Sequence, residues 1–109
     1  MVLKKKTLYW TTEAKKDLKN ISIYYKKEAS KEVASKQTKG IKHYVDLLLA
    51  NPLLGFKEPL LENAAKEYRS LIHGNYKIVY RIEDNTIYIN RVFDYRQDPD
   101  KLKQSIRQI

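Results

Sequence analysis

Two stretches in the first half of the chain place apolar residues at helical spacing. The first begins with Thr12 as an expected N-cap, and its apolar stripe consists of Ala14, Leu18, Ile21 and Tyr25. The second follows an expected cap at Ser30 and runs to Asn51 and Pro52, where the proline stops it. Its stripe consists of Ala34, Ile41, Val45 and Leu48. The two stretches together predict a helical hairpin.

The apolar period changes to two in the second half of the chain, which is the spacing of β-strands. Three strands are predicted, at 68–72, 76–83 and 86–93, joined by turns at 73–75 and 84–85. In the middle strand, alternation separates two faces. One face carries Tyr76, Ile78, Tyr80 and Ile82, and the other carries Lys77, Val79 and Arg81. Consecutive strands with such short connections form an antiparallel meander.

Two further segments surround the hairpin. Residues 3–10 end in β-forming side chains and predict an N-terminal strand with Leu8 and Trp10 on one face. Residues 51–65 contain two prolines and a glycine, so we expect an irregular connection whose leucines pack on the core.

The end of the chain predicts one more element. Asp98 and Pro99 form a typical helix start, and Leu102 with Ile106 would dock a short C-terminal helix. The chain has 109 residues, which suits a single domain over 1–109. The order of elements predicts an α+β fold in which the helical hairpin covers one face of the sheet.

The charge balance favours an anionic partner. Lys plus Arg total 22 against 13 Asp plus Glu, and the resulting net charge of +9 suits nucleic acid or an acidic protein surface, with solubility as the simpler explanation. Cysteine is absent, so packing alone must hold the fold. No apolar run approaches the roughly 18 residues of a membrane span, and no signal-like apolar region follows Met1. These features predict a cytoplasmic protein without a membrane partner.

The arginines are confined to the last third of the chain. They are Arg69, Arg81, Arg91, Arg96 and Arg107. Every earlier cation is a lysine. Because the guanidinium fork suits planar recognition of carboxylate or phosphate, each arginine is a candidate for a specific role.

Several kinds of site have no support in the sequence. His43 in a helix and His73 in a turn are not spaced as metal ligands and have no cysteine partners. The chain has only three glycines and no glycine-rich phosphate loop, and it carries no signature of a nucleophilic triad. We therefore expect neither a metal nor a cofactor.

The remaining candidates lie on one face of the sheet and at its exit. They are Lys77, Arg81, Arg96, Tyr95 and His73. Together they would form a cationic patch that holds a phosphate and stabilises charge developing on it. Each also has a structural explanation. Lys77 would be a solvated strand residue, Arg81 would pair with a carboxylate across the strands, and Arg96 would pair with Asp94 or Asp98 to order the turn. Tyr95 and His73 would be packing and turn residues.

Four segments, in order and spacing, resemble the RelE/ParE toxins of type II toxin–antitoxin modules, also called plasmid stabilisation proteins. The segments are Trp10-Thr-Thr-Glu-Ala-Lys-Lys-Asp-Leu, Arg69-Ser-Leu, Tyr76-Lys-Ile-Val-Tyr-Arg and Val92-Phe-Asp-Tyr-Arg-Gln-Asp-Pro. The resemblance spans nearly the whole chain. It implies a bacterial toxin that inhibits growth and is neutralised by a cognate, acidic antitoxin, which agrees with the net charge of +9.

The family holds two activities, namely ribosome-dependent cleavage of mRNA and inhibition of DNA gyrase by binding. Lys77 and Arg96 match positions where RelE-like toxins carry phosphate-handling arginines, so the resemblance makes them candidate catalytic residues. Tyr68 and Ser70, however, occupy the positions of a lysine pair. Leu102 likewise stands where these toxins have a tyrosine. The side chains that could take over the missing catalytic roles are Arg69, His73, Arg81 and Tyr95.

The long predicted hairpin resembles ParE-like members. It favours a toxin that acts by binding DNA gyrase, with a metal-independent mRNA endoribonuclease as the alternative. A non-toxic module that binds nucleic acid is the third possibility.

Overall fold

The computed structural model describes residues 6–96. Its first helix, α1, spans Thr12–Glu28, and the N-cap is Thr11, not Thr12 as predicted. The Thr11 hydroxyl accepts the Ala14 N–H at 3.2 Å and donates to the Ile89 carbonyl at 2.9 Å. Thr11 is buried, so one side chain both starts the helix and ties it to the sheet. That second contact is long-range, and it explains why Thr11 is preferred to the equally suitable Thr12.

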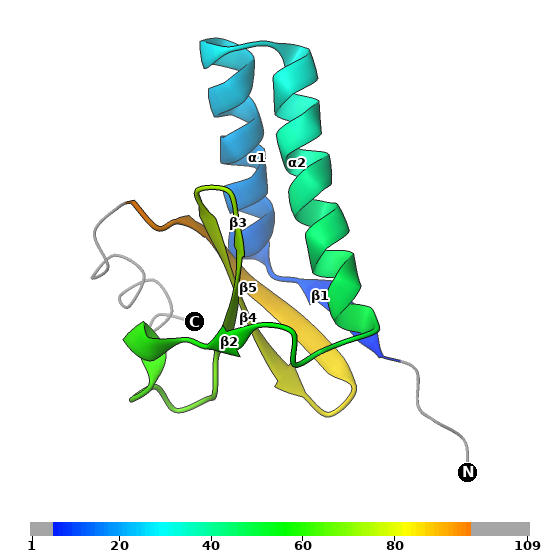
Figure 1. The fold of residues 1–109 in the computed structure, drawn as a ribbon, viewed down its shortest axis with the longest axis vertical. Coiled ribbons are helices and arrows are strands. Elements are labelled where there is room, and N and C mark those ends of the chain that lie inside the picture. The colour runs from blue at the N-terminus through cyan, green and yellow to red at the C-terminus, as the bar shows by residue number, and fades with distance from the viewer. Residues whose placement is uncertain (1–5, 97–109) are drawn as a thin grey trace.

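The second helix, α2, spans Lys31–Asp46, and Ser30 caps it by accepting the Val33 N–H at 3.1 Å, as predicted. The helix ends earlier than predicted, because the chain tightens into the 3₁₀ turn η1 (Leu47–Leu49) before the proline is reached. Figure 1 shows α1 and α2 as an antiparallel hairpin whose closed end projects beyond the sheet.

The sheet has five strands in the order β1-β5-β4-β3-β2. The predicted meander is present as β3 (Arg69–His73), β4 (Tyr76–Glu83) and β5 (Thr86–Asp94). The predicted N-terminal strand, β1 (Thr7–Trp10), lies parallel to β5. Both hairpin loops are two residues long, and Gly74 and Asp84 have positive φ there, as tight turns between twisted strands require.

The connection at 51–65 is more ordered than predicted. It contains the strand β2 (Phe56–Lys57), which pairs with β3, and the 3₁₀ turn η2 (Pro59–Leu61). The fully buried Tyr80 fixes the start of this connection. The Tyr80 hydroxyl donates to the Pro52 carbonyl at 2.7 Å and accepts the Gly55 N–H at 2.9 Å. A Cβ at Gly55 would lie 2.7 Å from the Ser70 carbonyl oxygen, so the close approach requires glycine.

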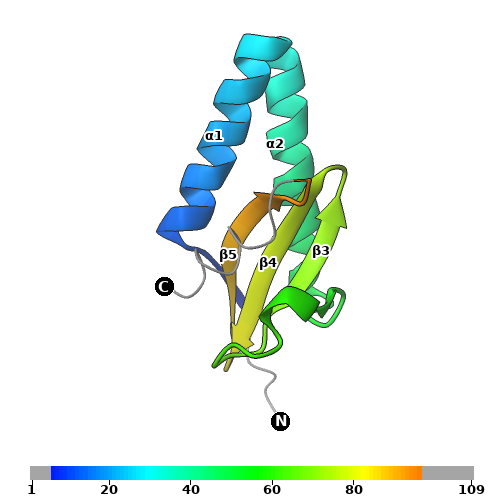
Figure 2. The same ribbon diagram turned by 90° about the vertical axis from the view of Figure 1, so that its left-hand side faces the viewer.

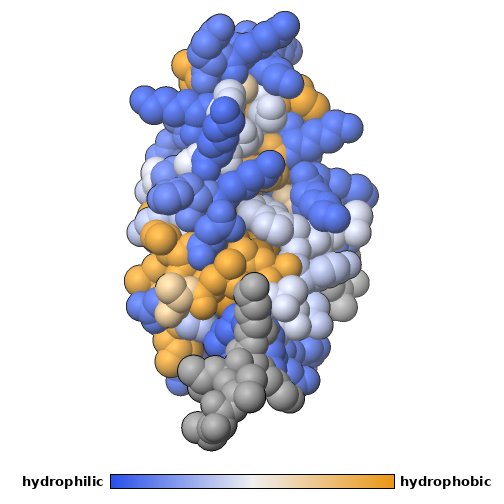
Figure 3. Space-filling model, turned by 90° about the vertical axis from the view of Figure 1, so that its right-hand side faces the viewer, coloured by the Kyte–Doolittle hydropathy of each residue, from blue (hydrophilic) through white to orange (hydrophobic). Residues whose placement is uncertain are grey.

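The leucines of this connection do not all pack on the core as predicted. Leu61 is buried, whereas Leu53 and Leu54 are 63% and 42% exposed. They follow Leu47 and Leu49, which are also exposed. Figure 3 shows hydrophobic surface gathered below the hydrophilic side chains of the hairpin. The aliphatic run at the end of α2 thus leaves apolar side chains in solvent.

The sheet separates two clusters of buried side chains. Strand alternation in β4 is as predicted, with Tyr76, Ile78 and Tyr80 in the core beneath the hairpin and Val79 in a smaller cluster on the opposite, outer face. Phe93 of β5 belongs to the outer cluster. Figure 2 shows α2 passing behind β3 and β4 while the segment after β2 lies in front of them. The predicted C-terminal helix from Asp98 lies outside the described residues.

A β-bulge in β5 changes which residues face the helices. Val79 pairs with Arg91 and Tyr80 pairs with Ile89, so Asn90 is the extra residue. Ile89 before the bulge and Val92 after it both join the core beneath the hairpin. In a regular strand, residues separated by an odd number of positions would face opposite sides of the sheet. Asn90 is fully buried, and neither polar atom of its side chain has a hydrogen-bond partner in the described part of the chain.

Candidate functional site

Lys77, the first candidate, is part of a buried ion pair on the outer face of the sheet. Its Nζ donates to Oε1 of Glu58 at 2.8 Å, and the Ser70 hydroxyl donates to Oε2 of the same carboxylate at 2.9 Å. The Glu58 side chain is fully buried and that of Lys77 is 14% exposed. Glu58 immediately precedes Pro59 of η2, so the segment across the outer face places it. The ammonium of Lys77 is neutralised by this partner.

Arg96, the second candidate, forms a bidentate pair with Asp94. Its Nε and Nη2 donate to the two carboxylate oxygens at 2.9 and 2.6 Å, and its backbone N–H donates to Oδ1 at 3.0 Å. The Arg96 hydrogen bonds hold the pKa of the Asp94 carboxyl below its usual range, and Asp94 in turn raises the pKa of Arg96. The ion pair with Asp94 that was the structural explanation for Arg96 is therefore present. The Arg96 side chain is still 58% exposed.

The two candidates lie on opposite faces of the sheet. Strand register pairs Tyr76 with Asp94 and Lys77 with Phe93. Paired residues share a face, so Asp94 lies with Tyr76 on the hairpin side, whereas Lys77 lies with Phe93 on the outer side. Because Arg96 is bound to Asp94, its guanidinium is on the hairpin side as well. The fold does not bring these two cations into one patch.

Arg69 and Arg81 also have partners. Arg69 donates to the Gly55 carbonyl at 2.7 Å and thereby holds the connection before β2. Arg81 pairs with Glu83 of its own strand at 3.2 Å, and its guanidinium lies 4.2 Å from the ring centroid of Tyr88 across the strands. The predicted cross-strand partner of Arg81 is thus an aromatic ring, and the carboxylate belongs to the same strand.

His73 and Tyr95 lie at the end of the sheet where β5 leaves it. The imidazole of His73 packs at 5.4 Å from the Tyr44 ring of α2, so it faces the hairpin. Tyr95 is 44% exposed, and its N–H donates to the Asn75 carbonyl at 3.2 Å. Neither side chain donates to or accepts from another candidate in the described part of the chain.

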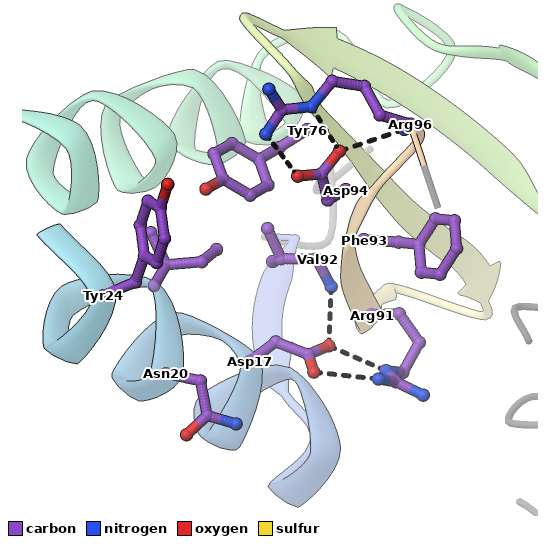
Figure 4. Close-up of a pocket in the computed structure, with 10 residues that line it drawn as sticks. Asp17, Asn20, Tyr24, Tyr76, Arg91, Val92, Phe93, Asp94 and Arg96 are labelled. Atoms are coloured by element: carbon purple, nitrogen blue, oxygen red, sulfur yellow. Dashed lines mark hydrogen bonds and ion pairs between the residues drawn. The ribbon is translucent and has the colours of Figure 1, made fainter. Parts of the chain in front are cut away.

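The hairpin-side end of the sheet opens into a hollow of about 600 Å³ (Figure 4). Helix α1 supplies one wall with Asp17, Asn20, Ile21 and Tyr24, and the sheet supplies the other with Tyr76, Arg91, Val92, Phe93, Asp94 and Arg96. The pKa of Tyr76 is raised well above its usual value. Burial is the main cause, and the neighbouring Tyr25 hydroxyl is the second.

Asp17 and Arg91 connect the two walls. Arg91 donates to both oxygens of Asp17 at 2.7 and 2.9 Å, and the Val92 N–H donates to Oδ2 at 2.9 Å. The hydrogen bonds that Arg91 donates to the Asp17 carboxylate raise the pKa of Arg91. Sequence reasoning missed Asp17, although it lies between Ala14 and Ile21 on the core-facing stripe of the helix, where a carboxylate requires a partner. The described lining thus holds two guanidinium groups and two carboxylates, each pair satisfied internally.

The family model for the ParE toxin of the type II toxin–antitoxin system parDE matches residues 8–99. The chain belongs to this ParE toxin family. The match extends from the N-terminal strand β1 through the end of the meander and beyond it, so it includes every residue described in this subsection.

Two solved structures share the fold of this chain. A chain of the chromosomal ParDE TA system from P. aeruginosa is 24% identical, with a TM-score of 0.71 over 83% of this chain and 96% of that one. The YoeB dimer from Staphylococcus aureus is 22% identical, with a TM-score of 0.52 over 82% of this chain and 95% of that one. No curated protein matches the chain significantly.

This ParE-family chain was also compared with the requirements of a metal site and of a membrane-spanning helix. Within residues 6–96, no three or more acidic or histidine side chains are grouped so that they could hold a metal ion. The same part of the chain has no helix that is both long and apolar enough to cross a bilayer.

Proposed function

We propose that this ParE-family toxin arrests bacterial growth by binding a target such as DNA gyrase, and that a cognate antitoxin neutralises it. The observation that carries the preference for binding is the separation of Lys77 and Arg96 on opposite faces of the sheet, each engaged by a carboxylate. The family match supports the toxin role, and the similar P. aeruginosa structure is one of a ParDE TA system.

Metal-free RNA cleavage makes demands that this arrangement does not meet. The 2′-hydroxyl must be deprotonated, the charge on phosphorus must be stabilised, and the leaving oxygen must be protonated, all at one phosphate. Arg96 is half-exposed but Lys77 is held behind the sheet by Glu58. Ser70, which occupies one position of the RelE lysine pair, donates to that same carboxylate instead. Binding to a protein target needs no such convergence.

The test measures growth arrest and its cause in the same cells. The full chain is expressed from a tight promoter without an antitoxin, after which plasmid supercoiling and mRNA cleavage sites are determined. We expect arrest with loss of negative supercoiling and no codon-specific cuts, and inhibition of supercoiling by purified gyrase. Unimpaired growth at high soluble expression would contradict the toxin role.

Arg96→Ala is the informative variant for the alternative activity. The Arg96 side chain is 58% exposed and solvent screens its pair with Asp94, so the variant is expected to fold. If the parent chain produces codon-specific mRNA cuts and this variant does not, the activity is ribosome-dependent cleavage and not gyrase inhibition. Lys77→Ala is less suitable, because it leaves a buried carboxylate without its counter-ion.

A further inference from the structure

Four leucines at the end of α2 point into solvent. Leu47 and Leu49 belong to η1, and Leu53 and Leu54 follow in the connection to β2. Their exposed fractions are 41%, 42%, 63% and 42%. Leu48, between the first two, is fully buried and anchors the segment in the core beneath the hairpin. We call the four exposed side chains the leucine turn.

Hydrogen bonds fix the backbone of the leucine turn. The Asn51 N–H donates to the Leu47 carbonyl at 3.1 Å, and the Leu54 N–H donates to the Asn51 carbonyl at 3.1 Å. The buried Tyr80 hydroxyl donates to the Pro52 carbonyl at 2.7 Å. The exposed leucines are thus carried by backbone that is already ordered, so a partner that covers them would lose little affinity to the ordering of a loop.

The leucine turn carries no charge. No ionisable side chain lies between Asp46 and Lys57, although 32% of the residues in the chain are charged. An acidic protein or a nucleic acid would therefore find no cation to pair with inside this segment. The segment is complementary to another apolar surface, and a second copy of the chain presents one of the same size and composition.

We propose that two copies of the chain associate through their leucine turns in an isologous dimer. Exposed to this degree, four leucines offer on the order of 300–400 Å² of apolar area, which is in the range of surface patches that mark interaction sites. A standard interface takes about 800 Å² from each partner, and somewhat more than half of that area is apolar. The leucine turn thus supplies most of the apolar area that one partner of such a dimer contributes. This association goes beyond the growth-arrest proposal and does not depend on it.

The net charge of +9 opposes dimerisation, but the fold separates it in part from this surface. The leucine turn follows the end of α2 that is opposite the closed end of the hairpin (Figure 1), and Lys26, Lys27 and Lys31 lie at that closed end. Two copies that meet at the leucine turn can keep these lysines apart. Salt screens the repulsion that remains, so the dimer should tighten as the salt concentration rises. An association held by charge pairs would respond in the opposite direction.

Sedimentation equilibrium of the purified full chain measures this association. We expect the average mass to rise from that of one chain toward that of two at concentrations on the order of 10–100 µM. The dissociation constant should fall about threefold or more between about 50 and 500 mM NaCl. A chain that stays monomeric up to about 1 mM at both salt concentrations refutes the proposal, and so does an association that weakens as salt rises.

Leu53→Asp locates the interface. Leu53 is the most exposed of the four leucines, so the variant is expected to fold. In an isologous dimer the change acts twice and places two carboxylates in the apolar contact, so the dissociation constant should rise about tenfold or more. The matched control is Ile23→Asp, which changes an aliphatic side chain of α1 that is 52% exposed. Both variants lower the positive charge of each copy by one, so the control should dimerise at least as well as the parent chain. Equal weakening in the two variants would rule out the leucine turn as the interface.

Leu49→Ser tests the apolar contact without a new charge. It should raise the dissociation constant about threefold or more while the far-UV circular dichroism stays that of the parent chain, and an unchanged constant counts against the proposal. Vesicles of phosphatidylglycerol are the probe for a lipid surface. A monomeric chain that binds them and loses this binding in Leu53→Asp would overturn the dimer in favour of a membrane surface. None of these assays contains gyrase or ribosomes, so their failure leaves the growth-arrest proposal untouched.

Discussion

The buried pair of Glu58 and Lys77 predicts an asymmetric response to mutation. Lys77→Met removes the ammonium and leaves the fully buried carboxylate with the Ser70 hydroxyl as its one remaining side-chain partner among residues 6–96. Glu58→Gln removes the opposite charge, but the amide oxygen still accepts from Lys77 and the amide NH₂ donates to the Ser70 oxygen. The remaining ammonium is 14% exposed and retains some access to water. Losing the lysine should therefore cost more than losing the carboxylate charge.

The magnitudes follow from that difference. Removing one partner of a buried ion pair typically costs about 3–5 kcal/mol, and the partial exposure of Lys77 places Lys77→Met near the lower limit, about 3 kcal/mol. For Glu58→Gln, which preserves both hydrogen bonds in a neutral form, we expect about 1 kcal/mol. In the double variant a neutral Gln faces a neutral Met, so it should be about 1–2 kcal/mol more stable than Lys77→Met alone.

Urea denaturation followed by the fluorescence of Trp10 measures these differences, because Trp10 packs against the core beneath the hairpin. The matched control is Lys57→Met on β2. Lys57 is exposed, and it forms no ion pair within the described part of the chain, so its loss should change stability by less than about 0.5 kcal/mol. The reasoning fails if Lys77→Met costs no more than Lys57→Met, or if the double variant is as unstable as the sum of the two single changes.

Three further predictions concern other contacts of the fold. Asp17→Asn should destabilise by about 1–3 kcal/mol in thermal denaturation, because the Arg91 guanidinium loses a partly buried carboxylate; a shift in Tm below about 2 °C would contradict this. Thr11→Val should cost about 1–3 kcal/mol in urea, more than Thr12→Val, since only Thr11 caps α1 and bonds to β5. Burial raises the pKa of Tyr80, so its contribution is complete below about pH 10 and is lost as the pH rises further; Tyr80→Phe should show a shallower alkaline loss of stability, and equal slopes would refute the assignment.

The elements with regular periodicity were predictable from the sequence. The stripe of α1, the Ser30 cap and the alternation of β4 each follow from local spacing, which depends only on neighbouring residues. Thr11 shows the limit of local information. Two adjacent threonines are equally good caps, and the choice depends on a hydrogen bond to a residue 78 positions away.

The contacts that the sequence did not reveal join segments far apart in the chain. Glu58 lies in a connection without periodicity, 19 positions before Lys77 in sequence, and β2 is only two residues long. The bulge at Asn90 also has no local signal, yet it reverses the facing of the end of β5 and thereby places Val92 and Asp94 on the hairpin side. The candidate patch failed to assemble for this reason, because facing depends on register.

The distribution of charge in the fold reverses the expectation from composition. Arginines were the expected contacts for an anionic partner, because they are few and late in the chain. In residues 6–96 every arginine instead has an internal acceptor: Gly55, Glu83, Asp17 and Asp94 engage the four of them. Four lysines of the two helices form no ion pair in that part of the chain, namely Lys15, Lys19, Lys26 and Lys42. The arginines therefore hold segments of the fold together, whereas the lysines of α1 and α2 contribute charge that no carboxylate of the described residues offsets.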